Sequence, residues 1–269
     1  MAPTASGLST DVDDDRLLAI LEAAADAIED AMYGLSTTDR RLRGNGHGDQ
    51  FAFDVVADNA ATAVLLDAGL GVLSEESGLL CPERPIRVVL DPIDGSTNLS
   101  RGLDPYGPSL CAYDNRGPRT GLVVNLATSV RYVAVRGAGS WRDGRRLVAA
   151  DSDGLSLVVT GDPVPDIPSP IWARVSGASA HDLCRVADGT FDAYFDHRNR
   201  VSIWDYAAGA LVVTEAGGIV ADRDGRALYR QDSEADTRLM AAGSAVQFGA
   251  LSRLLASLTW ETGALDGLA

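Results

Sequence analysis

The segment VVLDPIDGSTN at residues 88–98 places the strongest constraint on what this chain can fold into. An apolar run stops at Asp91, and a second carboxylate, Asp94, follows three residues later, just before Gly95. An ordinary turn needs only one Asp or Gly to end a strand. The segment therefore contains more polar groups than a turn requires.

The spacing of the two carboxylates predicts a β-turn at the end of a strand. Positions i and i+3 of such a turn lie within about 7 Å of each other, and Pro92 at i+1 pre-sets the backbone angle. Two anions at that distance repel, so they must share a proton, pair with arginine or bind cations. Mg²⁺ prefers such oxygen ligands, and an exposed carbonyl such as that of Ile93 adds a neutral one.

The residues after this turn are typical of a helix start. Gly95, Ser96 and Thr97 would present backbone N–H groups, and a helix N-terminus of this kind binds phosphate. Carboxylates for a metal beside amides for a phosphate indicate phosphoryl chemistry. A DPxDG segment by itself is commonly only a turn, so the hypothesis depends on carboxylates from other parts of the chain.

Four further acidic residues stand at the ends of predicted elements. Glu75 and Glu76 follow an apolar strand, and Asp54 and Asp205 lie at the starts of predicted helices. Acidic residues are favourable at a helix N-terminus in any case. Helix capping or a solvated turn would therefore explain each of them taken singly.

Composition argues against several classes of function. The 269 residues are 46% apolar, as in a globular protein with a sizeable core. The net charge of -15 repels nucleic-acid backbones, so we expect no nucleic-acid partner. All 23 basic residues are arginine, which excludes a Schiff-base lysine and a P-loop lysine.

The termini and the cysteines indicate the cellular compartment. No window approaches about 18 consecutive apolar residues, and the N-terminus lacks the basic start and apolar middle of a secretory signal. We therefore expect a cytoplasmic protein with no membrane partner. Cys81, Cys111 and Cys184 form no CxxC pair and are predicted to be reduced core residues.

Hydrophobic periodicity predicts helices at 15–32 and 53–69, then an antiparallel meander of strands over 108–146. Strands and helices alternate after it. We predict an N-terminal α+β part, residues 1–150, with the meander sheet and the metal motif. A C-terminal α/β part, residues 151–269, would contain the WD-AAG motif.

Three segments resemble the signatures of the inositol monophosphatase family, the magnesium-dependent, lithium-sensitive sugar-phosphate phosphatases. They are LSEESG at 73–78, LDPIDGSTN at 90–98 and WDYAAGALVVTEAGG at 204–218, and the layout is similar over residues 15–258. The resemblance implies the α+β fold of that family, a layered α/β/α/β/α sandwich with the site between its two parts.

The resemblance also implies a set of metal ligands. Glu75, Asp91 and the carbonyl of Ile93 would hold a first Mg²⁺, and Asp91, Asp94 and Asp205 a second. Asp91 would bridge the two ions. In relatives the acid at the position of Glu76 supports the site or a weaker third metal, so two or three Mg²⁺ per site are expected.

The implied catalytic residues are Asp54, Glu75 and Ser96. Ser96 stands where animal members have threonine, and Asp54 matches the aspartate that bonds to that hydroxyl. This pair would orient and deprotonate the nucleophilic water. The amides of Gly95, Ser96 and Thr97 would bind the phosphate. The implied reaction is direct hydrolysis by metal-activated water.

Substrate contacts are implied by RVSGASAHDLCRVADGTFDAYFD, which is similar to the sugar-contacting region of the family. Gly177, Ala178 and Ser179 match backbone contacts to the substrate, and Asp196 matches an acid that binds a sugar hydroxyl. Arg198 and Arg200 depart from the animal pattern and resemble prokaryotic relatives that also accept fructose bisphosphate. They would hold a second phosphate or simply lie in a solvated loop.

The leading hypothesis is thus a Mg²⁺-dependent phosphomonoesterase, a phosphatase, acting on inositol monophosphate or a related sugar phosphate. The alternatives are fructose-1,6-bisphosphatase or dual-specificity activity and, from another class, a non-catalytic protein that binds inositol phosphate or metal. The five carboxylates Asp54, Glu75, Asp91, Asp94 and Asp205 are all present, which argues against the last alternative. Members of the family are commonly homodimers, and we expect the same here.

Overall fold

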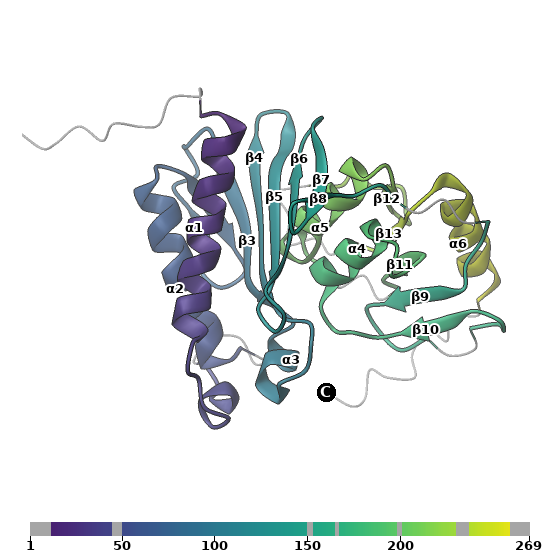
Figure 1. Cartoon of the computed structure of the whole chain (residues 1–269), viewed down its shortest axis with the longest axis horizontal. Coiled ribbons are helices and arrows are strands. Elements are labelled where there is room, and N and C mark those ends of the chain that lie inside the picture. Colours follow the sequence, from purple (N-terminus) through teal and green to yellow (C-terminus); the bar gives the residue numbers. More distant parts are fainter. Residues whose placement is uncertain are drawn as a thin grey trace, which may run out of the picture.

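Alternating layers of helix and sheet make up the chain (Figure 1). The computed structural model describes residues 12–44, 50–149, 153–164, 167–197, 201–229 and 237–258. Two helices cover one face of an eight-stranded sheet, two more lie between it and a five-stranded sheet, and one covers the far face of the second sheet. The α/β/α/β/α sandwich predicted from the sequence is confirmed.

The eight-stranded sheet is formed by the N-terminal half of the chain. Its order is β2-β1-β3-β4-β5-β6-β7-β8, with β1 and β3 parallel and all other neighbours antiparallel. The strands from β4 onward are the predicted meander. The bounds are β1 (Gly71–Ser74), β2 (Gly78–Leu80), β3 (Arg87–Asp94), β4 (Gly107–Asp114), β5 (Gly117–Asn125), β6 (Val130–Val135), β7 (Gly139–Arg142) and β8 (Arg145–Arg146).

Helices α1 (Asp14–Met32) and α2 (Ala52–Asp67) form the outer layer, joined through the short helix η1 (Asp39–Arg41). The side chains of Leu17, Leu21 and Ile28 recur at helical spacing on α1 and are fully buried against α2 and the sheet. The predicted helices at 15–32 and 53–69 are confirmed within a residue or two at each end.

Helices α4 (Ser179–Ala187) and α5 (Ile203–Glu215) fill the space between the two sheets. Helix α5 packs against α4 and against the first sheet, so it is buried on more than one face. Small residues on these faces allow the close packing. A Cβ atom on Gly209 would lie 2.7 Å from the Ala180 carbonyl oxygen. The AAG run of the third signature therefore allows α5 to pack closely on α4.

The second sheet has the order β10-β9-β11-β13-β12, and β9 lies parallel to both β10 and β11. Sequence patterns missed β2, β10 and β12, which lie at sheet edges and, with three or four residues each, are too short to show a periodic pattern. The remaining bounds are α3 (Ser96–Arg101), β9 (Leu157–Thr160), β10 (Trp172–Arg174), β11 (Ala193–Phe195), β12 (Ile219–Asp222), β13 (Leu239–Ala242) and α6 (Ala245–Ser257).

The division into parts 1–150 and 151–269 stays a prediction. The first sheet ends at Arg146 and the second begins at Leu157, so each sheet does come from one part. Yet α4 and α5 of the second part pack directly on the first sheet and share one apolar core with it. The two parts are therefore joined by a continuous interior.

The predicted β-turn at Asp91–Asp94 is wrong. Strand β3 continues through Asp94, and its pairing with β4 shifts register between Asp91, opposite Ser109, and Asp94, opposite Gly107. Pro92 has no N–H for the ladder, so an extra residue is accommodated as a bulge. The strand ends instead at Gly95, whose φ is 86°, and α3 begins directly after it.

The cysteine prediction holds in two of three cases. Cys111 and Cys184 are buried free thiols, but Cys81 is only half-buried because it lies in the connection after the edge strand β2. Within the described segments, no helix is both long enough and apolar enough to span a bilayer.

Candidate active site

A cavity of about 1350 Å³ opens where the two sheets and the helix starts converge. Its walls come from residues that are far apart in the sequence. The predicted site residues that line it are Asp54, Glu75, Asp91, Ile93, Asp94, Gly95, Ser96, Thr97, Gly177, Ser179, Asp196 and Asp205. The structure therefore brings together nearly all described residues that the sequence singled out.

Glu75 and Asp91 are neighbours because β1 and β3 are parallel. Ser74 pairs with Leu90, and the Glu75 N–H donates to the Leu90 carbonyl at 3.1 Å, so the next pair along the ladder is Glu75 beside Asp91. Side chains at paired positions of adjacent parallel strands lie side by side on the same face of the sheet. Strand register, rather than loop conformation, fixes this pair of carboxylates.

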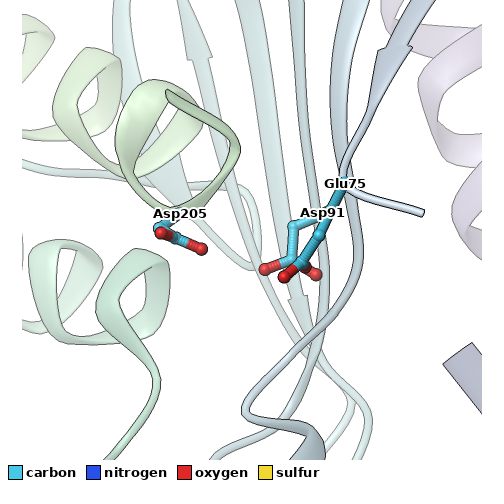
Figure 2. Close-up of side chains that lie close together, drawn as sticks. All are labelled: Glu75, Asp91 and Asp205. Carbon is cyan, nitrogen blue, oxygen red and sulfur yellow. The ribbon is translucent and has the colours of Figure 1, made fainter. Parts of the chain in front are cut away.

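Asp205 approaches the same point from the N-terminus of α5. Its Oδ2 accepts the Ser202 N–H at 2.7 Å, which caps the helix. Figure 2 shows its carboxylate directed toward those of Asp91 and Glu75. One oxygen from each of the three lies within 4.8 Å of the others.

The electrostatics of this cluster suit a cation. Burial raises the pKa of Asp91 well above its usual range, and the charges of Glu75 and Asp94 raise it further. Burial, then the charges of Asp205, Glu76 and Asp54, raise the pKa of Glu75 to about 8. Glu75 is an exposed residue in the lining of the cavity, so water screens part of this repulsion. Hard oxygen donors held together against their own repulsion fit Mg²⁺.

Asp94 is more constrained than the sequence indicated. Its carboxylate accepts the N–H groups of Ser179 at 3.1 Å and Ala180 at 2.8 Å, at the start of α4. Burial and the charge of Asp182 raise its pKa, and the hydrogen bonds from α4 oppose that rise. Asp94 therefore joins the first sheet to the second part of the chain at the cavity wall.

Ser96 and Asp54 form the hydrogen bond that the resemblance implied. The Ser96 hydroxyl lies 2.7 Å from Asp54 Oδ1 and 2.9 Å from the Ile93 carbonyl oxygen. One hydroxyl proton serves only one acceptor at a time, and a carboxylate is the stronger acceptor. Donation to Asp54 leaves the Ile93 carbonyl available to a cation.

Gly95, with φ 86°, is the N-cap of α3 and places the start of this helix at the cavity. The N–H groups at a helix start have no acceptor within the helix. Gly95, Ser96 and Thr97 all line the cavity next to the carboxylates. The start of a helix and a group of acidic side chains therefore line the same cavity.

Gly95→Ala is expected to destabilise the protein by about 2 kcal/mol or more. Gly95 has φ 86°, and an added Cβ would lie 2.8 Å from the Pro105 carbonyl oxygen. Gly177→Ala is the matched control, because its φ is 80° but the nearest atom to its Cβ, Asn98 Oδ1, is 3.6 Å away. Urea denaturation should show a clearly larger loss for Gly95→Ala, and equal losses would contradict the proposed clash.

The implied substrate contacts lie on the side of the cavity formed by the second part of the chain. Gly177 and Ser179 line it, whereas Ala178 is buried and the Ser179 N–H is bonded to Asp94. Asp196, at the end of β11, is 3% exposed and lines the cavity. Arg198 and Arg200 lie outside the described residues.

Several lining residues were not predicted from the sequence. Gly161 and Asp162 follow β9, which is parallel to β11, so they lie at the same sheet edge as Asp196. Their position directly after an apolar strand could have marked Gly161 and Asp162 as site residues, as it did for Glu75. Gln50, whose side chain hydrogen-bonds to Glu76, and Trp204, a neighbour of Asp205, offered no comparable signal.

Sequence comparison identifies a family and relatives that are similar to this chain. The model of the inositol monophosphatase family matches residues 14–262. A fructose-1,6-bisphosphatase/inositol-1-monophosphatase of Archaeoglobus fulgidus is 36% identical over 196 residues, which cover 70% of this chain and 76% of that protein. The protein of the same name from Thermococcus kodakarensis is 34% identical, covering 72% and 78% respectively.

Comparison of folds agrees with the sequence matches. A Pyrococcus horikoshii protein described as similar to inositol-1 monophosphatase superposes with a TM-score of 0.83 at 24% identity, covering 92% of this chain and 100% of its own. At that identity the superposition shows the shared fold. Taken with the family match over nearly the whole chain, it means that this protein belongs to the inositol monophosphatase family and is a phosphatase.

Proposed function

We propose that the protein hydrolyses inositol monophosphate, or a related sugar phosphate, in a reaction that requires Mg²⁺. The observation that carries the proposal is the meeting of Glu75, Asp91 and Asp205 within 4.8 Å, beside the start of α3. The names of the Archaeoglobus and Thermococcus relatives support the choice of substrate class.

The residues that would hold two or three Mg²⁺ are Glu75, Asp91, Asp94, Asp205 and the carbonyl of Ile93. Cations bound there would act as Lewis acids toward the phosphoryl oxygens and lower the pKa of the nucleophilic water. The carboxylates of this set would contribute the negative charge that draws cations to the site. The amides of α3 would bind the phosphate and stabilise the charge that develops on it.

Proton transfer is assigned to Ser96 and Asp54. With its proton donated to Asp54 Oδ1, the Ser96 oxygen presents lone pairs to a water molecule in the cavity. The hydroxyl would accept a proton from that water and pass its own to Asp54. Asp196 and the backbone near Gly177 would orient the sugar hydroxyls from the opposite wall.

The test is a phosphate-release assay over inositol 1-phosphate, fructose 1,6-bisphosphate, histidinol phosphate and phosphoadenosine phosphate, with Mg²⁺ or with EDTA. We expect the fastest turnover on inositol 1-phosphate and none in EDTA. Turnover that persists in EDTA, or a lack of turnover on every sugar phosphate, would refute the proposal.

Fructose-1,6-bisphosphatase activity is the second candidate, because the relatives carry both activities in their name. Here the discriminating result is the ratio of kcat/KM for the two sugar phosphates in one preparation. A ratio strongly in favour of fructose 1,6-bisphosphate would make it the principal substrate. The roles of Arg198 and Arg200 stay predictions from the sequence.

Ser96→Ala is expected to reduce kcat about a hundredfold, because it removes the proton relay between water and Asp54. Ser96→Thr keeps the hydroxyl and should retain most of the activity. Ser100→Ala is a control on the same helix, since Ser100 is buried and its hydroxyl bonds only locally, to the Thr97 carbonyl at 2.7 Å. Comparable losses in Ser96→Ala and Ser100→Ala would argue against the relay.

A further inference from the structure

Asp58 is a buried carboxylate that neither the signatures nor the proposed reaction uses. It lies on α2 one turn after Asp54, and only 3% of it is exposed. Its Oδ1 accepts the Ser74 hydroxyl at 2.5 Å and the Ser77 hydroxyl at 3.3 Å. Both hydroxyls flank the pair Glu75 and Glu76.

The hydrogen bond to Ser74 continues into the backbone that carries the two acids. Ser74 Oγ accepts the Glu76 N–H at 3.2 Å. Because the serine proton is directed at Asp58, the lone pairs of its oxygen are left for that N–H. The carboxylate of Asp58 thus fixes the orientation of the Ser74 hydroxyl. The Ser74 oxygen in turn fixes the position of the Glu76 backbone N–H.

Burial of this carboxylate has a cost in stability. Burial raises the pKa of Asp58, and the bonds from Ser74 and Ser77 only partly oppose that rise. The free-energy cost of burying a carboxyl group is offset by the hydrogen bonds that the group makes. At Asp58 those bonds go mainly to the two ends of a single turn between β1 and β2.

The same face of α2 therefore serves two loops of the site. Residues four apart on a helix lie on one face. Asp54 bonds to Ser96 in the β3–α3 segment, and Asp58 bonds to Ser74 at the end of β1. The helix acts as a common support for the carboxylate pair on one side and the phosphate-binding amides on the other.

We propose that Asp58 is a positioning residue: through Ser74 and Ser77 it holds the β1–β2 turn so that Glu75 and Glu76 face the metal cavity. The inference rests on the proposed Mg²⁺ site, and it assigns Asp58 no contact with the substrate. Its effect is on the affinity for the cation.

The experiment measures Mg²⁺ affinity by isothermal titration calorimetry on chelator-treated protein, together with the melting temperature. Asp58→Ala is expected to weaken Mg²⁺ binding about tenfold or more, as loss of an outer-shell partner does. Asp58→Asn keeps an oxygen acceptor for Ser74 and should recover most of the affinity. Adding Ser74→Ala to Asp58→Ala should cause little further loss, because both changes break the same chain of contacts.

Thr62→Val is the matched control one turn further along α2. The Thr62 hydroxyl lies 2.7 Å from the Asp58 carbonyl oxygen and 3.4 Å from that of Asn59, so both of its acceptors lie within α2. Its loss should lower the melting temperature and leave Mg²⁺ affinity unchanged. If Asp58→Ala likewise lowers the melting temperature and leaves the Mg²⁺ affinity unchanged, the role of Asp58 is structural only and the inference is overturned.

The remaining outcomes are also decisive. Equal weakening in Asp58→Asn and Asp58→Ala would mean that charge alone matters, which overturns positioning through Ser74. If Asp58→Ala does not fold, Ser74→Ala takes its place, and unchanged affinity in that variant overturns the inference. Wild-type protein that binds Mg²⁺ but releases no phosphate would defeat the proposed function alone, whereas wild-type protein that binds no Mg²⁺ would defeat both.

Discussion

Asp91→Asn is expected to reduce phosphate release about a thousandfold and, in the absence of metal, to make the protein more stable. Loss of an outer-shell partner of a metal already costs about 10–100-fold, so loss of a central ligand should cost more. The gain in stability has a separate cause. Asp91 is 2% exposed, and its raised pKa reflects burial and the repulsion from Glu75 and Asp94. An amide of the same shape removes that repulsion.

The two effects are measured separately, by kcat in saturating Mg²⁺ and by urea denaturation in EDTA. Asp67→Asn, at the exposed C-terminal end of α2, is the control for removal of a carboxylate, and it should change neither quantity appreciably. A loss of activity accompanied by a loss of metal-free stability would indicate that Asp91→Asn damages the fold, contrary to the expected result.

The stability of the metal-free protein is expected to fall as the pH rises from about 4.5 to about 8. The pKa of Glu75 is raised from 4.5 to about 8 in the folded chain, first by burial and then by the charges of Asp205, Glu76 and Asp54. Between these values the folded state binds more protons than the unfolded state, so stability decreases with rising pH. The raised pKa values of Asp91 and Asp94 act in the same direction.

Mg²⁺ should reverse this dependence, because it binds the deprotonated carboxylates. At about a hundredfold excess over its Kd, a ligand of the folded state adds about 2.7 kcal/mol. We therefore expect a large rise in melting temperature with Mg²⁺ at pH 8 and a small one at pH 5. Glu75→Gln should flatten the pH dependence in EDTA. A rise of equal size at both pH values would contradict the assignment of these carboxylates to the metal.

Much of the fold could be predicted because its signals are local. The apolar spacing in α1, the WDYAAG start of α5 and the β-rich runs of β4 to β6, separated by turn residues, are patterns within single elements. The strands that were missed, β2, β10 and β12, lie at sheet edges and bury few side chains. Their position depends on pairing with a neighbour, which no short stretch of sequence encodes.

The sequence by itself determined the chemical inventory of the site: the carboxylates, the hydroxyl of Ser96 and the helix start at Gly95. Only the tertiary structure decided which of these groups meet. Parallel pairing sets Glu75 beside Asp91, and contacts across 85 residues direct Asp94 to the amides of α4. Local patterns fix what a segment can form, whereas distances between segments depend on strand register and packing over the whole chain.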